Sequence, residues 1–416
     1  MPERLIGFLG LLVFIVLAWL LSTNRRRFPW RTVVTGLALQ FIIGLLALRT
    51  QAGAAVFSWL DQAFLRLLGF ADEGNKLVFG PLGDRDFLTG QWGAPHSFIF
   101  AISITGTIVL IAAISSFLYH YGILQRIVRA AAWIMERLMR TSGSESLAAA
   151  ANIFMGQTEA PMVVKPYLKG MTRSEIMALM TGGMATIAGG VLAAYVGFGI
   201  SAGHLITASI MSAPAALMMA KIMLPETEVS ETAAGARADI ERETTNGIDA
   251  LCRGAADGIK LSINVMAMLI AFVAIVALAN FLIAWVLNLG GVAEPKPLQH
   301  FFAWINAPFA WLMGVPWRDC SAVGSILGER IVLNEFVAYY NLKDMIKAVT
   351  VDPRSSTIAT YALCGFANFG SIAIQIGGIG SVVPERRADL ASLGVKAMIA
   401  GLLACYCTAS IAGLLT

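Results

Sequence analysis

Charge is the scarcest property of this sequence. Charged residues make up 13% of its 416 residues, whereas 57% are hydrophobic and the mean hydropathy is +0.72. Soluble domains carry about 25% charged residues, so this composition excludes a protein with a large aqueous domain and indicates a membrane protein. The net charge of +4 is too small to favour nucleic acid as a partner.

Cysteine and histidine are also rare, with five and four residues respectively. The cysteines fall mostly within apolar runs and no pair has the spacing of a zinc site, so we expect small core residues. The histidines are scattered, and the sequence contains no HExxH motif. The sequence therefore predicts neither a metal site built from these residues nor an organic cofactor.

Long apolar runs, by contrast, are abundant. Eight of them are long enough to cross a bilayer: Leu5–Leu21, Val33–Leu48, Ser97–Tyr119, Ile176–Ile200, Leu205–Leu224, Ile259–Leu287, Thr357–Val382 and Ala391–Leu415. No small-residue cleavage pattern stands out near the first run, so we expect it to remain as a signal anchor. These runs predict an all-α polytopic membrane protein with about eight transmembrane helices.

Basic residues between the spans predict the orientation of the chain. They gather after the first span, after the third and before the last, at Arg25–Arg27, Arg126–Arg140 and Arg386–Lys396. Acidic residues such as Asp61 and Asp84 lie between the second and third spans. Placing the basic loops in the cytoplasm puts both termini on the periplasmic or extracellular side.

Two further segments are apolar but interrupted by polar residues, which suits neither a crossing helix nor an ordinary loop. They run from about Thr141 to Leu168 and from about Pro316 to Tyr340, and a full span follows each. We interpret them as re-entrant helical hairpins, which enter the membrane and leave on the same side. By the loop charges they open to opposite sides, so hairpin and following helix form an inverted repeat with a substrate site near its centre.

One linker, from Pro225 to Asn246, is strongly polar, with Glu226, Glu228 and Glu231 followed by further charges from Asp239 to Glu243. We interpret it as a solvated cytoplasmic connection, because acidic linkers bind nothing by default.

The first hairpin carries GQTEAP, Gly156 to Pro161, at its expected tip. Gly156 permits a reversal of the backbone, and Pro161 suits the first turn of a returning helix whose free amides would face a polar ligand. Gln157 can donate and accept hydrogen bonds at once, as the edge of a heterocyclic base demands. Glu159 costs at least ~2.5 kcal/mol at bilayer depth, so we expect it in a wet cavity. A helix cap or a salt bridge is the alternative role for this carboxylate.

The second hairpin places Glu335 among apolar residues. The span after it contains GFANFGS, Gly365 to Ser371, and the span after the first hairpin contains TIAGG, Thr186 to Gly190. We expect both to be unwound helix middles that offer carbonyl groups to a ligand or cation. Tight helix packing through small residues is the alternative. Phe366 is suited to stack on a flat ring, although apolar core is the commoner role of a phenylalanine.

Four motifs, GQTEAP, NEF, GFAN and TIAGGVLAAY, closely resemble those of the bacterial branch of the concentrative nucleoside transporter family. They occur in the same order, and the resemblance covers nearly the whole chain. It implies a secondary active transporter, not an enzyme, that imports nucleosides across the inner membrane by symport with sodium. It also implies a homotrimer in the lipid bilayer, with a scaffold domain and a transport domain that moves as an elevator. A proton-coupled symporter, with Glu159 or Glu335 as the carrier, is the alternative.

The same resemblance implies roles for individual residues. Those expected to bind the nucleoside are Gln157, Thr158 and Glu159 at the base, Val191 and Phe366 as apolar walls, and Glu335, Asn368 and Ser371 at the ribose. For sodium it implies the side chains of Asn152 and Thr186 with the carbonyls of Met155 and Ile187. All four are hard oxygen donors, as a hard cation requires. Gly370 stands where some relatives have a hydroxyl residue, so its role is in doubt.

On this basis we expect five parts in the chain. Residues 1–122 hold three scaffold helices, and residues 123–200 hold an interfacial helix, the first hairpin and the following helix of the transport domain. Two helices and the polar linker 225–246 fall within 201–296. A second interfacial helix, the second hairpin and the unwound helix fall within 297–382, and the last transmembrane helix within 383–416.

Other function classes fit the sequence less well. A literal G-x-S-x-G, Gly199 to Gly203, followed by His204, raises the possibility of an intramembrane hydrolase, but that motif requires a strand-to-helix elbow and here falls in a short loop between spans. A passive channel would show no accumulation above equilibrium under any ion gradient. A structural protein would leave two buried acids without a purpose.

Overall fold

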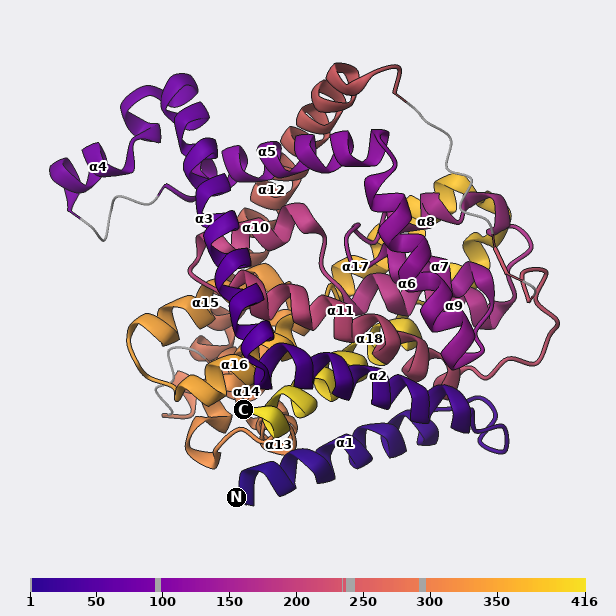
Figure 1. Ribbon diagram of the computed structural model, residues 1–416. Coiled ribbons are helices and arrows are strands. Elements are labelled where there is room, and N and C mark those ends of the chain that lie inside the picture. Colours follow the sequence, from indigo (N-terminus) through magenta and orange to yellow (C-terminus); the bar gives the residue numbers. More distant parts are fainter. Residues whose placement is uncertain (1, 94–98, 234, 237–243, 292–296) are drawn as a thin grey trace.

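The computed structural model describes residues 2–93, 99–233, 235–236, 244–291 and 297–416, and its regular structure over these ranges is helical, without a strand (Figure 1). The expected start of the third span at Ser97 and the linker charges from Asp239 to Glu243 lie outside the described residues. The prediction of an all-α polytopic membrane protein is confirmed.

Seven spans are long and apolar enough to cross a membrane, within the described ranges. They are α1 (Pro2–Leu20), α2 (Trp30–Arg49), α5 (Phe100–His120), α9 (Arg173–Ala185) together with α10 (Gly189–Gly197), α11 (Ala202–Met223), α12 (Gly247–Leu289) and α18 (Arg387–Leu415), the last preceded by a short 3₁₀ turn, η4 (Pro384–Arg386). The remaining predicted span, Thr357–Val382, is divided into α16 (Pro353–Leu363) and α17 (Phe369–Val382).

Both predicted interruptions are present. Thr186 to Ala188, here the first break, separates α9 from α10, and Cys364 to Asn368, the second break, separates α16 from α17. Asn368 ends the second break as the N-cap of α17, because its side chain accepts a hydrogen bond from the Ser371 amide at 2.8 Å. Each break leaves the end of one half-helix next to the start of another inside the protein.

The first hairpin consists of α7 (Gly143–Ala151), a turn, the single turn α8 (Ala160–Val163) and a 3₁₀ turn, η3 (Lys165–Tyr167). A capping box between Ser142 and Glu145 starts α7. Pro161 lies in the first turn of the returning helix, as expected, but this helix is short: Pro166, which follows, has no amide hydrogen with which to continue the helical hydrogen bonds. The φ angle of Gly156 is not positive, so the turn does not require glycine for its backbone conformation. Glycine instead leaves room for Ala188, because a Cβ at position 156 would lie 3.2 Å from the Ala188 Cβ.

The second hairpin consists of α14 (Trp317–Val332) and α15 (Glu335–Lys347), and α13 (Pro297–Leu312) packs along it. Asn334 turns the chain between the two arms, and its side chain accepts a hydrogen bond from the Val337 amide at 3.0 Å. Glu335 is therefore the first residue of α15.

The segment after α2 differs from the prediction of a loop. It forms the 29-residue helix α3 (Gln51–Phe79), a 3₁₀ turn η1 (Gly80–Gly83) and α4 (Arg85–Trp92). Helix α3 packs on α2, α5 and α11, and α4 lies beyond its far end, away from the rest of the molecule (Figure 1). The charges of α3 lower its hydropathy and hide it from a search for apolar runs. Asp61 fixes this helix to α11, since its carboxylate accepts from the amide of Ala202 at 2.7 Å.

Helices α9, α11 and α18 form the centre of the molecule, and α1 and α2 pack against α11 and α18. Helix α12 packs along α5 and is otherwise largely exposed. Only 6% of its membrane-spanning apolar stretch is buried, against 89% of the corresponding stretches of α11 and α18. The amphipathic α6 (Ile123–Met139) lies against α7 and α2. The chain ends meet, because Arg4 donates to the Thr416 carbonyl at 3.0 Å.

Part of the polar linker is packed rather than solvated. The Gly143 amide donates to the Thr232 carbonyl at 3.0 Å, and Thr172 donates to the Glu226 carboxylate at 2.8 Å. Lys221 also forms a buried ion pair with Glu145 at 2.6 Å. The linker is therefore anchored to the starts of α7 and α9 at Glu226, Ser230 and Thr232, while residues 227–229 and Glu231 are exposed, as the interpretation of a solvated connection expects.

Candidate substrate and ion site

The two hairpins meet at the second break through buried polar side chains. Asn368 donates to the Glu335 carboxylate at 3.0 Å, and Gln157 donates to the Ser371 hydroxyl at 3.0 Å. The structure thus brings together four residues that the sequence selected, from the first hairpin, the second hairpin and α17. All four are buried, with exposed fractions of at most 7%.

Glu335 is held by two donors. Besides Asn368, the Tyr195 hydroxyl donates to the other carboxylate oxygen at 2.9 Å. The Tyr195 ring stacks on Tyr339 with ring centroids 4.3 Å apart. A buried carboxylate requires such charge-assisted hydrogen bonds to offset its desolvation.

Thr158 and Glu159 lie outside this group of hydrogen bonds. Both are exposed at the turn of the first hairpin, and the Glu159 carboxylate folds back to accept from the Gly156 amide at 3.1 Å. The Thr158 methyl group faces α17, where a Cβ on Gly378 would lie 3.2 Å from it. Glu159 is thus exposed, and its carboxylate supports the turn.

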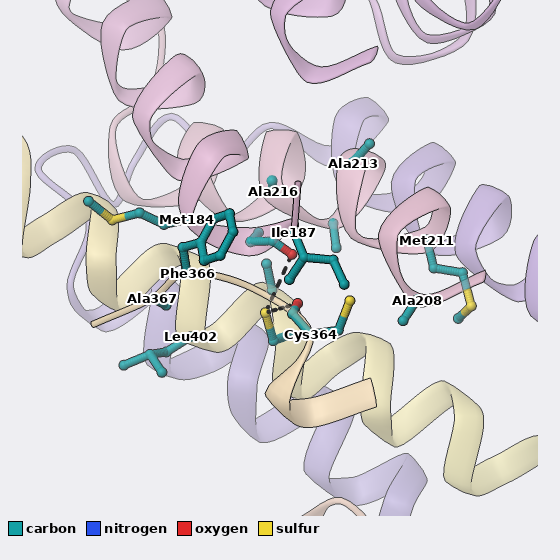
Figure 2. Close-up of a cluster of buried hydrophobic side chains, with 14 of the residues drawn as sticks. Met184, Ile187, Ala208, Met211, Ala213, Ala216, Cys364, Phe366, Ala367 and Leu402 are labelled. Carbon is teal, nitrogen blue, oxygen red and sulfur yellow. Dashed lines mark hydrogen bonds between the residues drawn. The ribbon is translucent and has the colours of Figure 1, made fainter. Parts of the chain in front are cut away.

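Apolar side chains line the second break. Phe366 is buried in a cluster that includes Met184 and Ile187, and Figure 2 shows these three side chains close together. Val191 is buried in the same core from α10. An aromatic ring at a polar break supplies a flat surface next to hydrogen-bonding groups.

The four residues expected to hold sodium lie at the turn of the first hairpin and the first break. Asn152 is 1% exposed, and neither its side-chain oxygen nor its nitrogen has a hydrogen-bond partner among the described residues. It packs on α9, where a Cβ on Gly182 would lie 2.9 Å from the Asn152 amide nitrogen. Thr186 donates to the Gly182 carbonyl at 2.9 Å, which leaves its oxygen lone pairs as acceptors.

The turn and the first break are also joined directly. The Gly189 amide at the start of α10 donates to the Phe154 carbonyl at 3.3 Å. Met155 follows Phe154 directly, and Ile187 lies two residues before Gly189. A buried amide without a partner requires an explanation, and a hard cation that binds its oxygen provides one.

Known protein families identify this arrangement. The profile for the Na+ dependent nucleoside transporter C-terminus matches residues 204–413, that for the N-terminus matches residues 9–82, and a nucleoside-recognition Gate profile matches residues 101–202. The chain belongs to the Na+ dependent nucleoside transporter family. The resemblance in four motifs is therefore confirmed.

Relatives within this nucleoside transporter family support the assignment. Solute carrier family 28 member 3 of Mus musculus is 41% identical over the whole chain, which spans 59% of that protein's length. The uncharacterized transporter YutK of Bacillus subtilis is 40% identical over 98% of both chains. The fold matches CNTnw in an inward-facing substrate-bound state, with a TM-score of 0.93 at 38% identity over 100% of this chain and 98% of that one. These relatives are transporters, which agrees with the expectation that the protein is not an enzyme.

In this transporter fold, two residues that sequence reasoning did not select complete the hydrogen bonds. Tyr195 lies in the quoted motif TIAGGVLAAY but had no assigned role. Gln375 donates to the Gln157 side chain at 3.2 Å and to the Met180 carbonyl at 3.1 Å. Its signal in the sequence is an amide four residues after Ser371 in an apolar helix, which places both on one helix face.

The serine of the hydrolase motif has a structural role in this family member. Ser201 is the N-cap of α11 and its hydroxyl donates to Asp61, while the His204 ring lies 3.3 Å from the Tyr361 hydroxyl. No strand precedes Ser201 in the part of the chain that the structure describes, so the elbow that a nucleophile requires is absent. A cavity of about 680 Å³ lies elsewhere, between the packed linker and residues such as Arg140 and Lys221, and none of the predicted site residues lines it.

Proposed function

We propose that this protein is a secondary active transporter that imports nucleosides across the inner membrane in symport with sodium. The observation that carries the proposal is the set of buried hydrogen bonds linking Gln157, Ser371, Asn368 and Glu335, because it joins both hairpins at a broken helix. Broken helices that meet inside the protein are where transporters of inverted-repeat architecture bind substrate.

The chemistry of these groups suits a nucleoside. An amide such as Gln157 matches the paired donor and acceptor on the edge of a base, and a carboxylate such as Glu335 accepts from two ribose hydroxyls. A bound nucleoside would replace the bonds that Gln157 and Glu335 now make to Ser371 and Asn368. Phe366 would supply the apolar wall against the base.

Sodium coupling rests on the first break. The unpartnered Asn152 amide, at the end of α7, and the Thr186 hydroxyl, at the end of α9, both lie against Gly182, and the Met155 and Ile187 carbonyls belong to the adjoining turn and break. These neutral oxygens fit a small hard cation and offer no carboxylate to a proton. Proton coupling through Glu159 or Glu335 is the alternative candidate, supported only by the presence of the two acids.

We also propose a division into a moving and a static part for elevator-type transport. Helices α1 and α2 pack on α11 and α18, whereas α5 and α12 pack mainly on each other. In support of this division, α5 and α12 are assigned to the scaffold and α1 and α2 to the transport domain, instead of a scaffold formed by all of residues 1–122. The joined termini agree with both ends lying on one side of the membrane.

Uptake into proteoliposomes tests the function. With labelled nucleoside outside, an inward sodium gradient is expected to drive accumulation above equilibrium, and an inward proton gradient without sodium is not. Accumulation driven by protons alone would indicate proton coupling through Glu159 or Glu335. Equilibration without accumulation under either gradient would indicate a passive channel.

Two variants test the site residues. Glu335→Ala is expected to abolish uptake, whereas the exposed Glu73→Ala on α3 serves as its control. Asn152→Ala is expected to raise the sodium concentration for half-maximal uptake, with the exposed Asn288→Ala on α12 as its control. Normal uptake by Glu335→Ala would disprove the ribose assignment, and an unchanged sodium dependence in Asn152→Ala would disprove the ion site.

A further inference from the structure

A fully buried arginine lies at the second break and has no part in the binding scheme above. Arg330, near the end of α14 in the second hairpin, is 0% exposed and is the largest of the fully buried side chains. Burying a guanidinium is costly unless its charge meets negative potential. Its surroundings therefore indicate what it does.

The hydrogen-bond partners of Arg330 are neutral. Its Nη1 atom donates to the Ala362 carbonyl, and its Nη2 atom lies 3.2 Å from the Cys405 sulfur. Its Nε atom has no partner within the described ranges. Ala362 is the second-last residue of α16, so the cation lies against the negative end of that half-helix, whose last carbonyls have no partner within the helix.

The end of α9 reaches the same point. The Cys405 sulfur, on α18, lies 3.2 Å from the Cys364 carbonyl and 3.6 Å from the carbonyl of Ala185, the last residue of α9. The dashed lines beside Cys364 and below Ile187 in Figure 2 mark hydrogen bonds to a cysteine sulfur. The contact is close, because a Cβ on Gly365 would lie 2.7 Å from the Met184 carbonyl oxygen. Two half-helix C-termini thus converge next to one guanidinium.

Arg330 itself makes no hydrogen bond to the first break: within the described ranges it donates to Ala362 and Cys405, and the end of α9 is reached only through Cys405. The buried side chain beside the first break is the neutral Asn152, whose amide is unpartnered in the described part of the chain. The two breaks therefore differ in charge. The first break has a neutral amide without a hydrogen-bond partner among the described residues, and the second has the positively charged Arg330. Helix C-termini favour a nearby cation in both cases.

We propose that Arg330 is a built-in cation that holds the second break in the shape that presents Phe366 and Asn368, so that only the first break requires a sodium ion. Arg330 is then a positioning residue, which acts on the nucleoside through Asn368 and Glu335. The proposal rests on the proposed nucleoside transport, and it specifies that uptake depends on sodium with a Hill coefficient near one.

Charge, rather than bulk, is the property to test. Arg330→Met is expected to raise the KM for nucleoside by about tenfold, and Arg330→Lys to stay within about threefold of the wild type, since a cation at a helix C-terminus is retained. Arg330→Gly is expected to regain uptake when guanidinium is added at millimolar concentration. Arg318→Met, on the exposed face of the same helix, is the control and is expected to have no effect on KM.

Three results would overturn the proposal: a normal KM in Arg330→Met, a defect in Arg330→Lys as large as in Arg330→Met, or a wild-type Hill coefficient near two. Should Arg330→Gly not fold, the comparison of the lysine and methionine variants still decides. Hydrogen exchange at residues 362–368 gives a readout that needs no transport. Faster exchange in Arg330→Met than in Arg318→Met supports the proposal even if the wild type fails to accumulate nucleoside, which would disprove the transport function alone.

Discussion

At the scale of single residues, the hydroxyl of Tyr195 has a defined energetic role. It is one of two donors to the buried Glu335 carboxylate, at 2.9 Å. Because hydrogen bonds to charged groups contribute about 1.5–3 kcal/mol, we expect Tyr195→Phe to raise the KM for nucleoside by roughly tenfold or more. Uptake kinetics in proteoliposomes measure this.

A matched control is available for that variant. Tyr361 is equally buried, but its hydroxyl contacts His204 rather than the binding residues. Tyr361→Phe is expected to lower the melting temperature without changing KM. Equal KM values for Tyr195→Phe and the wild type would show that the second donor to Glu335 is dispensable.

Sequence reasoning selected the residues that interrupt apolar helices but not those inside intact helices. Asn152, Gln157, Glu335 and Asn368 interrupt apolar runs, so their polarity is visible at once. Tyr195 lies inside α10 and its hydroxyl becomes significant only when Glu335, 140 residues later, is placed beside it. The assignments of nucleoside and sodium roles to these residues stay predictions.

At the scale of elements, the second break depends on Gly365. Its φ is +154°, and a Cβ there would lie 2.7 Å from the Met184 carbonyl oxygen. Because backbone atoms cannot move aside cheaply, we expect Gly365→Ala to destabilise the protein by about 3 kcal/mol. Thermal unfolding of the purified protein measures this.

The control is a glycine in open space on the next helix. A Cβ on Gly377 of α17 would meet no atom within 4 Å, so Gly377→Ala is expected to be neutral or stabilising by up to about 1 kcal/mol. A loss of stability as large as that of Gly365→Ala would show that the contact with α9 is not the cause.

Helices with a long apolar run in their own sequence were predictable, and helices whose extent depends on tertiary contacts were not. The spans and both breaks follow from long apolar runs with polar or glycine interruptions. Helix α3 was missed because charges such as Asp61 and Asp72 dilute its apolar residues. The sequence did not predict how short α8 is, because the length of a hairpin helix depends on its contacts with the rest of the fold. The prolines set only an upper limit on that length.

At the scale of the whole molecule, the exposed α12 bears on assembly. It presents large apolar side chains such as Ile270, Phe281 and Trp285 over a helix of 43 residues. We predict that the protein is a homotrimer, as the family resemblance implies, with a native mass of three times 44.4 kDa after subtraction of bound lipid. Native mass spectrometry measures this, and a monomer that still transports nucleoside would refute the trimer.

The pairing of Gln157 with Ser371 and of Glu335 with Asn368 bears on how such a protein avoids leaks. A carrier must recross the bilayer without cargo, and a site with unmet hydrogen-bonding groups would bring water and protons along. The groups proposed to bind the nucleoside hydrogen-bond to one another. In the proposed transport cycle, such mutual pairing would let the carrier recross the bilayer without water, so that the driving gradient would not be lost on the way back.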